Sequence, residues 1–107
     1  MAEQILQVSF RITVPAADYR RVAESVAPAF AAAPGLRWKL WYLDEKTARA
    51  GGWYLFDSEQ ALREFLSSPL AAQVRALPFA ADLQFTTAAV MTDVSAVTRA
   101  PIGAAVA

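Results

Sequence analysis

The stretch PGLRWKLWYLDEKTARAGGWYLFD, residues 34–57, contains all three tryptophans of the chain and two of its three tyrosines. Residues 36–43 and 53–56 have the large, alternating side chains of β-strands, and the charged segment 44–49 between them is typical of a solvated loop. The stretch therefore predicts a β-hairpin. Gly51 and Gly52 precede its second strand, and they are expected to make a turn there, with a bulge or a close backbone approach as the alternative.

A strand and a helix are expected before the hairpin. Apolar residues alternate with polar ones over 6–14, which predicts a strand with one buried face. Asp18 favours a helix start, and the helix then carries its apolar side chains at helical spacing: Tyr19, Val22, Ala23, Val26 and Phe30. Pro28 removes one hydrogen bond from this helix, so we expect a kink or an early end there.

A second helix and a fourth strand are expected after the hairpin. Asp57 and Gln60 fit a capping box, and an apolar helical face follows: Ala61, Leu62, Phe65 and Leu66. The break at Ser67-Ser68-Pro69 leads to a short helical piece over 70–77, because apolar side chains recur there at helical spacing. Alternation returns over 83–94 and predicts the fourth strand.

The order βαββαβ predicts an α+β, ferredoxin-like fold, in which a four-stranded antiparallel sheet carries both helices on one face. The other face would be bare, with Trp41, Leu43 and Val90 on it. A second copy of the sheet is the simplest cover, which predicts a homodimer whose two sheets close into a dimeric α+β barrel. We assign residues 1–94 to this single domain and 95–107 to a C-terminal tail that is either loose or laid over a partner subunit.

The composition excludes several functions. The charges of ten basic and ten acidic residues cancel, so the chain has no net positive charge that would attract nucleic acid. The chain has no cysteine and no histidine, which removes disulfides, thiolate nucleophiles and histidine bases, and leaves carboxylates as the only metal ligands. No apolar run approaches the roughly 18 residues of a membrane span, and the start MAEQILQ lacks the pattern of a signal peptide. We therefore expect a cytoplasmic protein that does not bind membranes.

The segments PGLRWKLW and AGGWYLF, with Glu45-Lys46 between them, resemble the hairpin of the YdhR-like monooxygenases, a branch of the dimeric α+β barrel superfamily. The similarity covers most of the chain, and the first helix departs from the pattern at Pro28. The resemblance implies a homodimer with a cavity in each subunit between sheet and helices. It also implies oxidation of a small phenol- or quinol-like substrate with dioxygen, without metal, flavin or other cofactor.

Candidate site residues come from the strands. Lys39 and Tyr54 are the candidate catalytic residues, because a buried lysine can act as a base or hold a phenolate and a tyrosine can donate to a substrate oxygen. Candidate residues for binding a small aromatic or hydrophobic substrate are Phe10, Trp38, Trp41, Trp53 and Phe85. The aromatic residues are equally well read as core or interface residues, and Lys39 as a lysine that reaches water. Alternation places Trp38 and Lys39 on opposite faces unless the strand is bulged.

Three functions remain open at this stage. The first is a cofactor-independent monooxygenase. The second is an isomerase or cyclase that moves protons on a small cyclic or polyketide-like molecule. The third is a non-catalytic ligand-binding dimer.

Overall fold

The computed structural model describes residues 2–102 of the chain. Its helices and strands follow the order β1 (Gln4–Ile12), α1 (Ala16–Ala31), β2 (Leu36–Asp44), β3 (Arg49–Phe56), α2 (Glu59–Leu66), α3 (Pro69–Arg75), β4 (Ala80–Ala89) and α4 (Thr92–Val97). The predicted βαββαβ order is confirmed, with α3 and α4 as additions to it. None of the helices within residues 2–102 is both long enough and apolar enough to cross a membrane.

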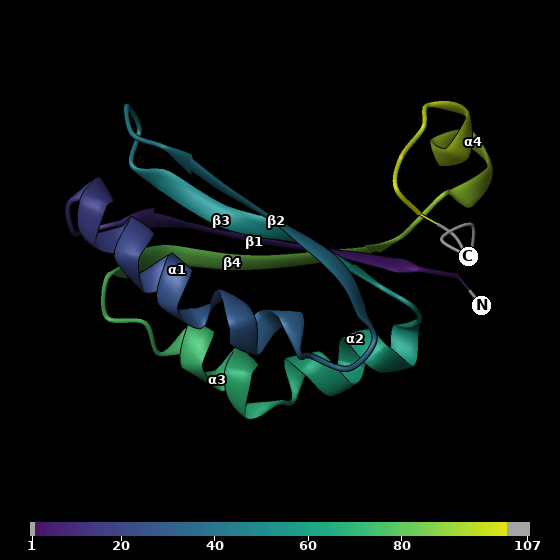
Figure 1. Cartoon of the computed structure of the whole chain (residues 1–107), viewed down its shortest axis with the longest axis horizontal. Coiled ribbons are helices and arrows are strands. Elements are labelled where there is room, and N and C mark those ends of the chain that lie inside the picture. The colour runs from purple at the N-terminus through teal and green to yellow at the C-terminus, as the bar shows by residue number, and fades with distance from the viewer. Residues whose placement is uncertain (1, 103–107) are drawn as a thin grey trace.

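The four strands form one antiparallel sheet in the order β2-β3-β1-β4. Helices α1, α2 and α3 lie on one face of this sheet, and α4 lies beyond one end of it, on the opposite side (Figure 1). The predicted ferredoxin-like α+β fold is therefore confirmed. The core fills the space between the sheet and the three helices, where the alternating apolar residues of β1 are buried: Leu6, Val8, Phe10 and Ile12.

Several predicted boundaries were wrong. β4 ends at Ala89 instead of continuing to 94, because residues 92–97 form the helix α4. Asp93 lies in the first turn of α4, where an acidic side chain stabilises a helix. The expected early end of α1 at Pro28 was wrong, because α1 runs through Pro28 to Ala31 and the carbonyl of Pro28 accepts a hydrogen bond from the amide of Ala32 at 3.2 Å. The alternative, a kink at Pro28, stays a prediction. Of the predicted tail, residues 103–107 lie outside the described residues.

The start of α2 also differs from the prediction. Ser58 caps this helix, and its hydroxyl accepts a hydrogen bond from the amide of Ala61 at 3.1 Å. Asp57 instead lies 3.2 Å from the guanidinium of Arg37 at the start of β2. Arg37 also pairs with the buried carboxylate of Glu3 at 3.6 Å, so these ion pairs connect the ends of β1 and β2 to the turn before α2.

Gly51 and Gly52 lie inside β3 and do not form the expected turn. A β-carbon on Gly51 would lie 1.9 Å from the carbonyl oxygen of Val8, and its φ of +153° is rare for other residues. A β-carbon on Gly52 would lie 2.7 Å from Cε of Lys39. The structure therefore shows the alternative, a close approach: the backbone of β1 lies against Gly51, and the side chain of Lys39 lies against Gly52.

The faces of β2 are the reverse of the expected ones. Trp41 and Leu43 pack against the core on the helix-covered face, where their cross-strand neighbours in β3 are Gly52 and Ala50. Alternation was correctly read, but both faces of β2 carry large apolar groups, so periodicity could not decide which face points inward. The third residue expected on the bare face, Val90, lies just beyond the end of β4, and its amide donates to the carbonyl of Glu3 at 2.9 Å.

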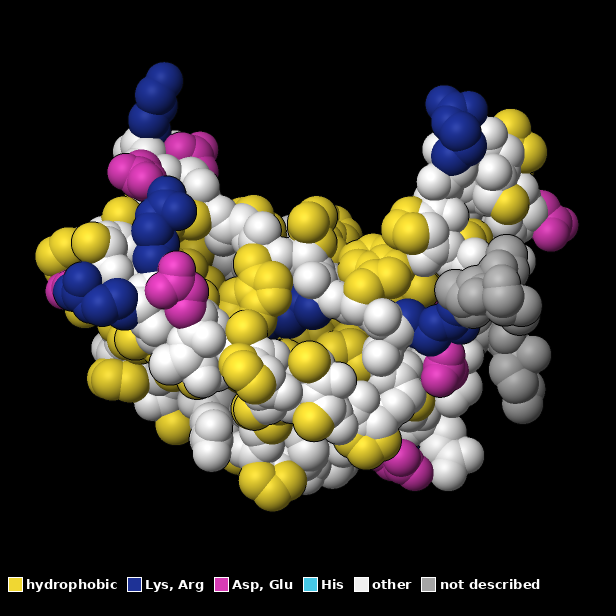
Figure 2. Space-filling view, viewed as in Figure 1, with side chains coloured by type: hydrophobic (Ala, Val, Ile, Leu, Met, Phe, Trp, Pro, Cys, Tyr) yellow, Lys and Arg dark blue, Asp and Glu magenta, His cyan; other side chains and the backbone are white. Residues whose placement is uncertain are grey.

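The face of the sheet opposite α1–α3 is hollowed between the β2–β3 hairpin and α4 (Figure 2). Leu40 is 57% exposed and Trp53 is 37% exposed on this face. Trp38 lies nearer to α4, and its indole N–H donates to the carbonyl oxygen of Pro101 at 2.7 Å. This open face is therefore apolar in part, and residues 2–102 cover only one end of it.

Candidate functional site

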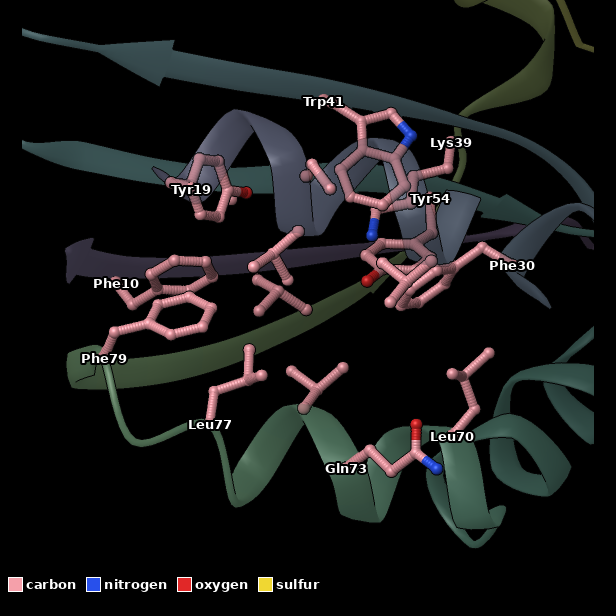
Figure 3. A pocket seen from close by; sticks show the side chains of 17 residues that line it. Phe10, Tyr19, Phe30, Lys39, Trp41, Tyr54, Leu70, Gln73, Leu77 and Phe79 are labelled. Carbon is pink, nitrogen blue, oxygen red and sulfur yellow. The ribbon is translucent and has the colours of Figure 1, made fainter. Parts of the chain in front are cut away.

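A cavity lies between the sheet and the helices α1 and α3 (Figure 3). The volume in which the centre of a water molecule fits is about 70 Å³. This is several times the ~10–15 Å³ that a cavity needs to hold one water. Its walls are almost entirely apolar, and the side chains that bring nitrogen or oxygen to it are Tyr19, Lys39, Trp41, Tyr54 and Gln73. A small, flat molecule with one polar substituent suits such a cavity.

Lys39 enters this cavity from β2. Its Nζ lies 3.5 Å from the centre of the Phe30 ring and 3.4 Å from that of Trp41. The Tyr54 ring centre is 4.6 Å away. Three aromatic rings therefore surround the amino group.

No ion pair neutralises this amino group. Within residues 2–102, no carboxylate lies within ion-pairing distance of Lys39; the ion pairs found there involve arginines only. Burial without a carboxylate disfavours the ammonium form and lowers the pKa of Lys39 to about 7. A substantial share of the side chain is then a neutral amine at physiological pH, which can accept a proton or act as a nucleophile.

Tyr54 lies beside Lys39 on the neighbouring strand β3, and the two residues are cross-strand partners. Its side chain is 1% exposed and packs against Phe30, Phe56 and Phe65. Burial, and secondarily the nearby Tyr19, raises the pKa of Tyr54 well above its ordinary value. Tyr54 therefore keeps its proton at neutral pH, and its hydroxyl points into the hollow between the sheet and α3 (Figure 3).

Tyr19 is a second phenol at the cavity, on α1. Burial raises its pKa, with a smaller contribution from Tyr42. Its ring packs edge-on between Phe10 and Phe79, with ring centres 5.9 and 6.0 Å away. Tyr19 also lines an outer groove between α1 and β2, and Trp41 lines both spaces. These two rings thus separate the cavity from the outer groove.

The structure brings together some of the sequence-predicted site residues and not others. Lys39, Tyr54, Phe10 and Trp41 all line the cavity. Trp53 does not, because its position in β3 alternates with that of Tyr54 and faces the open side.

Trp38 and Phe85 also lie outside the cavity. Trp38 lines a separate depression at the β2 edge, together with Lys39. The pairing of β2 with β3 shifts its register between Leu36 and Trp38. Phe85 packs against the core from β4, with the guanidinium of Arg75 5.2 Å from its ring centre.

Sequence reasoning did not name the helical half of the site. Tyr19 and Phe30 from α1, and Leu70, Val74 and Leu77 from or just after α3, complete the lining. The signal was present, because these residues form the apolar helical faces that the sequence analysis assigned to the core. The apolar character of these side chains predicts that they are buried. Their spacing along the helices is the same whether they line a cavity or fill a core, so the sequence could not show the cavity.

The sequence matches the family described as "Putative mono-oxygenase ydhR" over residues 5–101. The chain therefore belongs to this family, and membership supports a monooxygenase-like function in general terms. No protein of curated function matches the chain.

Solved structures with the same fold include proteins with and without a known activity. A protein of unknown function from Nitrosomonas europaea superposes with a TM-score of 0.73 at 17% identity, covering 96% of this chain and 98% of that one. The ActVA-Orf6 monooxygenase of Streptomyces coelicolor, in complex with nanaomycin D, gives 0.63 at 19% identity, covering 83% and 88%. SnoaB, a cofactor-independent oxygenase from Streptomyces nogalater, gives 0.67 at 17% identity, covering 85% and 95%.

Proposed function

We propose that this protein is a cofactor-independent monooxygenase that oxidises a small phenol- or quinol-like molecule with dioxygen in the cavity beneath α1 and α3. One observation carries the proposal: the amino group of Lys39 lies in an apolar cavity among Phe30, Trp41 and Tyr54, without a carboxylate partner in the described part of the chain. An unpaired base in an apolar, aromatic-walled space suits the deprotonation of a flat phenol.

The first step is a proton transfer. A phenol ring that enters the cavity can stack on its aromatic walls, with its hydroxyl directed to Nζ of Lys39. The neutral amine takes the phenol proton, and an ammonium–phenolate pair forms in surroundings of low polarity, where opposite charges attract strongly. The Tyr54 hydroxyl can donate a hydrogen bond to the phenolate oxygen and hold the ring in one orientation.

The second stage uses dioxygen as the oxidant. The phenolate passes one electron to dioxygen, and the resulting radicals combine at a ring carbon to give a peroxide anion. Lys39 returns its proton to this anion. Loss of water from the hydroperoxide, with the hydrogen of the same ring carbon, leaves a carbonyl group. One oxygen atom enters the product and the other leaves as water, so phenol and dioxygen give quinone and water.

We further propose that two copies associate through their open sheet faces. The exposed side chains of Leu40 and Trp53 support this, together with the hollow between the hairpin and α4 into which a second sheet can fit (Figure 2). A stable interface generally buries about 800 Å² on each partner. Sedimentation of a single 11.6 kDa species at micromolar concentration would contradict the dimer.

The test of the activity is oxygen consumption with a panel of phenols and hydroquinones. Lys39→Met should lower the rate by roughly 10²–10⁴-fold, as the loss of a general base does. Lys46→Met is the matched control, because Lys46 is the other lysine of the chain and is exposed in the hairpin loop. No oxygen uptake with any member of the panel contradicts the proposal. Turnover that persists without oxygen would identify an isomerase or cyclase, which can use the same base.

A further inference from the structure

The amino group of Lys39 has the surroundings of a nucleophile as well as those of a base. Its stem crosses Gly52, where a β-carbon would lie 2.7 Å from Cε, so the absence of a side chain at position 52 leaves the space that the lysine stem occupies. Phe30 and Trp41 limit the position of Nζ from two sides. The amine therefore lies against the rings of Phe30 and Trp41 at the wall of the cavity.

We propose that Lys39 forms an imine with small aromatic aldehydes that enter the cavity. This reaction uses the same side chain as the proposed oxygenase activity but does not depend on it, because it needs no dioxygen. Its ligand class is an aldehyde on a flat ring, since the walls accept a ring and the amine is the group that can react with a carbonyl carbon.

The chemistry balances without an added oxidant or reductant. The lone pair of Nζ attacks the carbonyl carbon, and transfer of one proton from nitrogen to oxygen gives a carbinolamine. The carbon–oxygen bond then breaks, the second N–H proton leaves with the oxygen, and the products are an imine and one water molecule. The Tyr54 hydroxyl can relay the proton, giving its own to the departing oxygen and receiving the one from nitrogen.

The charges around Nζ favour this reaction. The titratable groups that line the cavity with Lys39 are the phenols of Tyr19 and Tyr54, whose pKa values are raised so that both stay neutral. Burial also lowers the pKa of Lys39 to about 7, which supplies the unprotonated amine. The apolar walls offer water few hydrogen-bond partners, which disfavours the water that would hydrolyse the imine.

The test is reductive trapping under anaerobic conditions. The intact protein is incubated at pH 7 with benzaldehyde and sodium cyanoborohydride, which reduces imines to stable benzylamines, and the modified residue is located by peptide mass spectrometry. Lys39 should be benzylated at least about tenfold faster than Lys46, because an ordinary lysine is almost fully protonated at this pH. A phenol added as competitor should slow the labelling of Lys39 and leave that of Lys46 and the N-terminus unchanged.

Matched variants make the outcome decisive. Lys39→Met should lose the cavity adduct and Lys46→Met should keep it, while Tyr54→Phe should slow its formation without abolishing it. Circular dichroism shows whether each variant is folded. Labelling of Lys39 no faster than that of Lys46 would overturn the proposal. Labelling of Lys39 that no phenol slows would instead count against phenol binding, and so against the proposed oxygenase activity. Because oxygen is absent, the labelling of Lys39 itself is independent of whether the oxygenase activity is found.

Discussion

Replacing Lys39 by methionine should make the stability of the protein less dependent on pH. In the folded protein the pKa of Lys39 is about 7, against 10.5 for a lysine in water. Between these two values the unfolded chain binds more protons than the folded one, so the free energy of unfolding rises with pH. This stability is fully present above pH 10.5 and is lost as the pH falls toward 7. Methionine has a similar shape and no charge, so the variant lacks this dependence.

The expected size follows from the same values. Each tenfold change in proton affinity corresponds to about 1.4 kcal/mol, so the whole pKa change is worth roughly 5 kcal/mol. Above pH 10 the raised pKa values of Tyr19 and Tyr54 act in the opposite direction, because the folded state then keeps protons that the unfolded chain has lost. From pH 7 to 9.5 the wild-type protein should gain about 2–3 kcal/mol relative to the variant.

The assay is urea unfolding, followed by tryptophan fluorescence at several pH values and at a fixed protein concentration, since association also contributes to stability. Wild type, Lys39→Met and Lys46→Met are compared. The free energy of unfolding should rise with pH above 7 by the same amount for the wild type and Lys46→Met. At pH 7, Lys39→Met should be more stable than both. Parallel curves for all three proteins would refute the reasoning, because they would mean that Lys39 keeps its proton in the folded state.

Four further substitutions test the packing around the site, each by urea or thermal unfolding. Gly51→Ala should destabilise the fold by roughly 3 kcal/mol or prevent folding, since its β-carbon would lie 1.9 Å from the carbonyl oxygen of Val8. Gly52→Ala should cost less, about 1–2 kcal/mol, because its closest clash is with the flexible Lys39 side chain and the nearest backbone atom, the carbonyl oxygen of Leu40, is 3.1 Å away. Equal effects would contradict this difference. Phe65→Ala should cost about 3–5 kcal/mol, as it removes a buried ring from the aromatic core, and a loss below 1 kcal/mol would be inconsistent with that packing. Arg20→Ala should cost less than about 1 kcal/mol, because its 2.7 Å ion pair with Glu45 is largely exposed; a larger loss would mean that this pair holds α1 to the hairpin.

The architecture could be predicted from the sequence because its strands and helices have clear periods. The alternation in β1 and the helical spacing of Tyr19 to Phe30 each fix one buried face, and the order of the elements then determines the fold. The family resemblance agreed with this reading. The end of β4 was less predictable, since residues 90–94 alternate like a strand although 92–97 form a helix.

The site was only partly predictable for a physical reason. In β2, tryptophans occur on both faces, so hydrophobicity alone does not decide which face is buried, and lysine is a residue type that is rarely fully buried. The structure accommodates it there because Gly52 leaves room for its stem and aromatic rings receive its amino group. These are contacts between strands and a helix distant in sequence, and no local pattern contains them.

The central claim, that the cavity holds a lysine whose amine is free at neutral pH, is tested most directly by a carbon-13 NMR titration. The chain has two lysines, and a spectrum of Lys46→Met identifies the signal of Lys39 without ambiguity. The account predicts that the Cε resonance of Lys39 titrates with a pKa near 7. A midpoint at or above 10, the ordinary range of lysine, would contradict it.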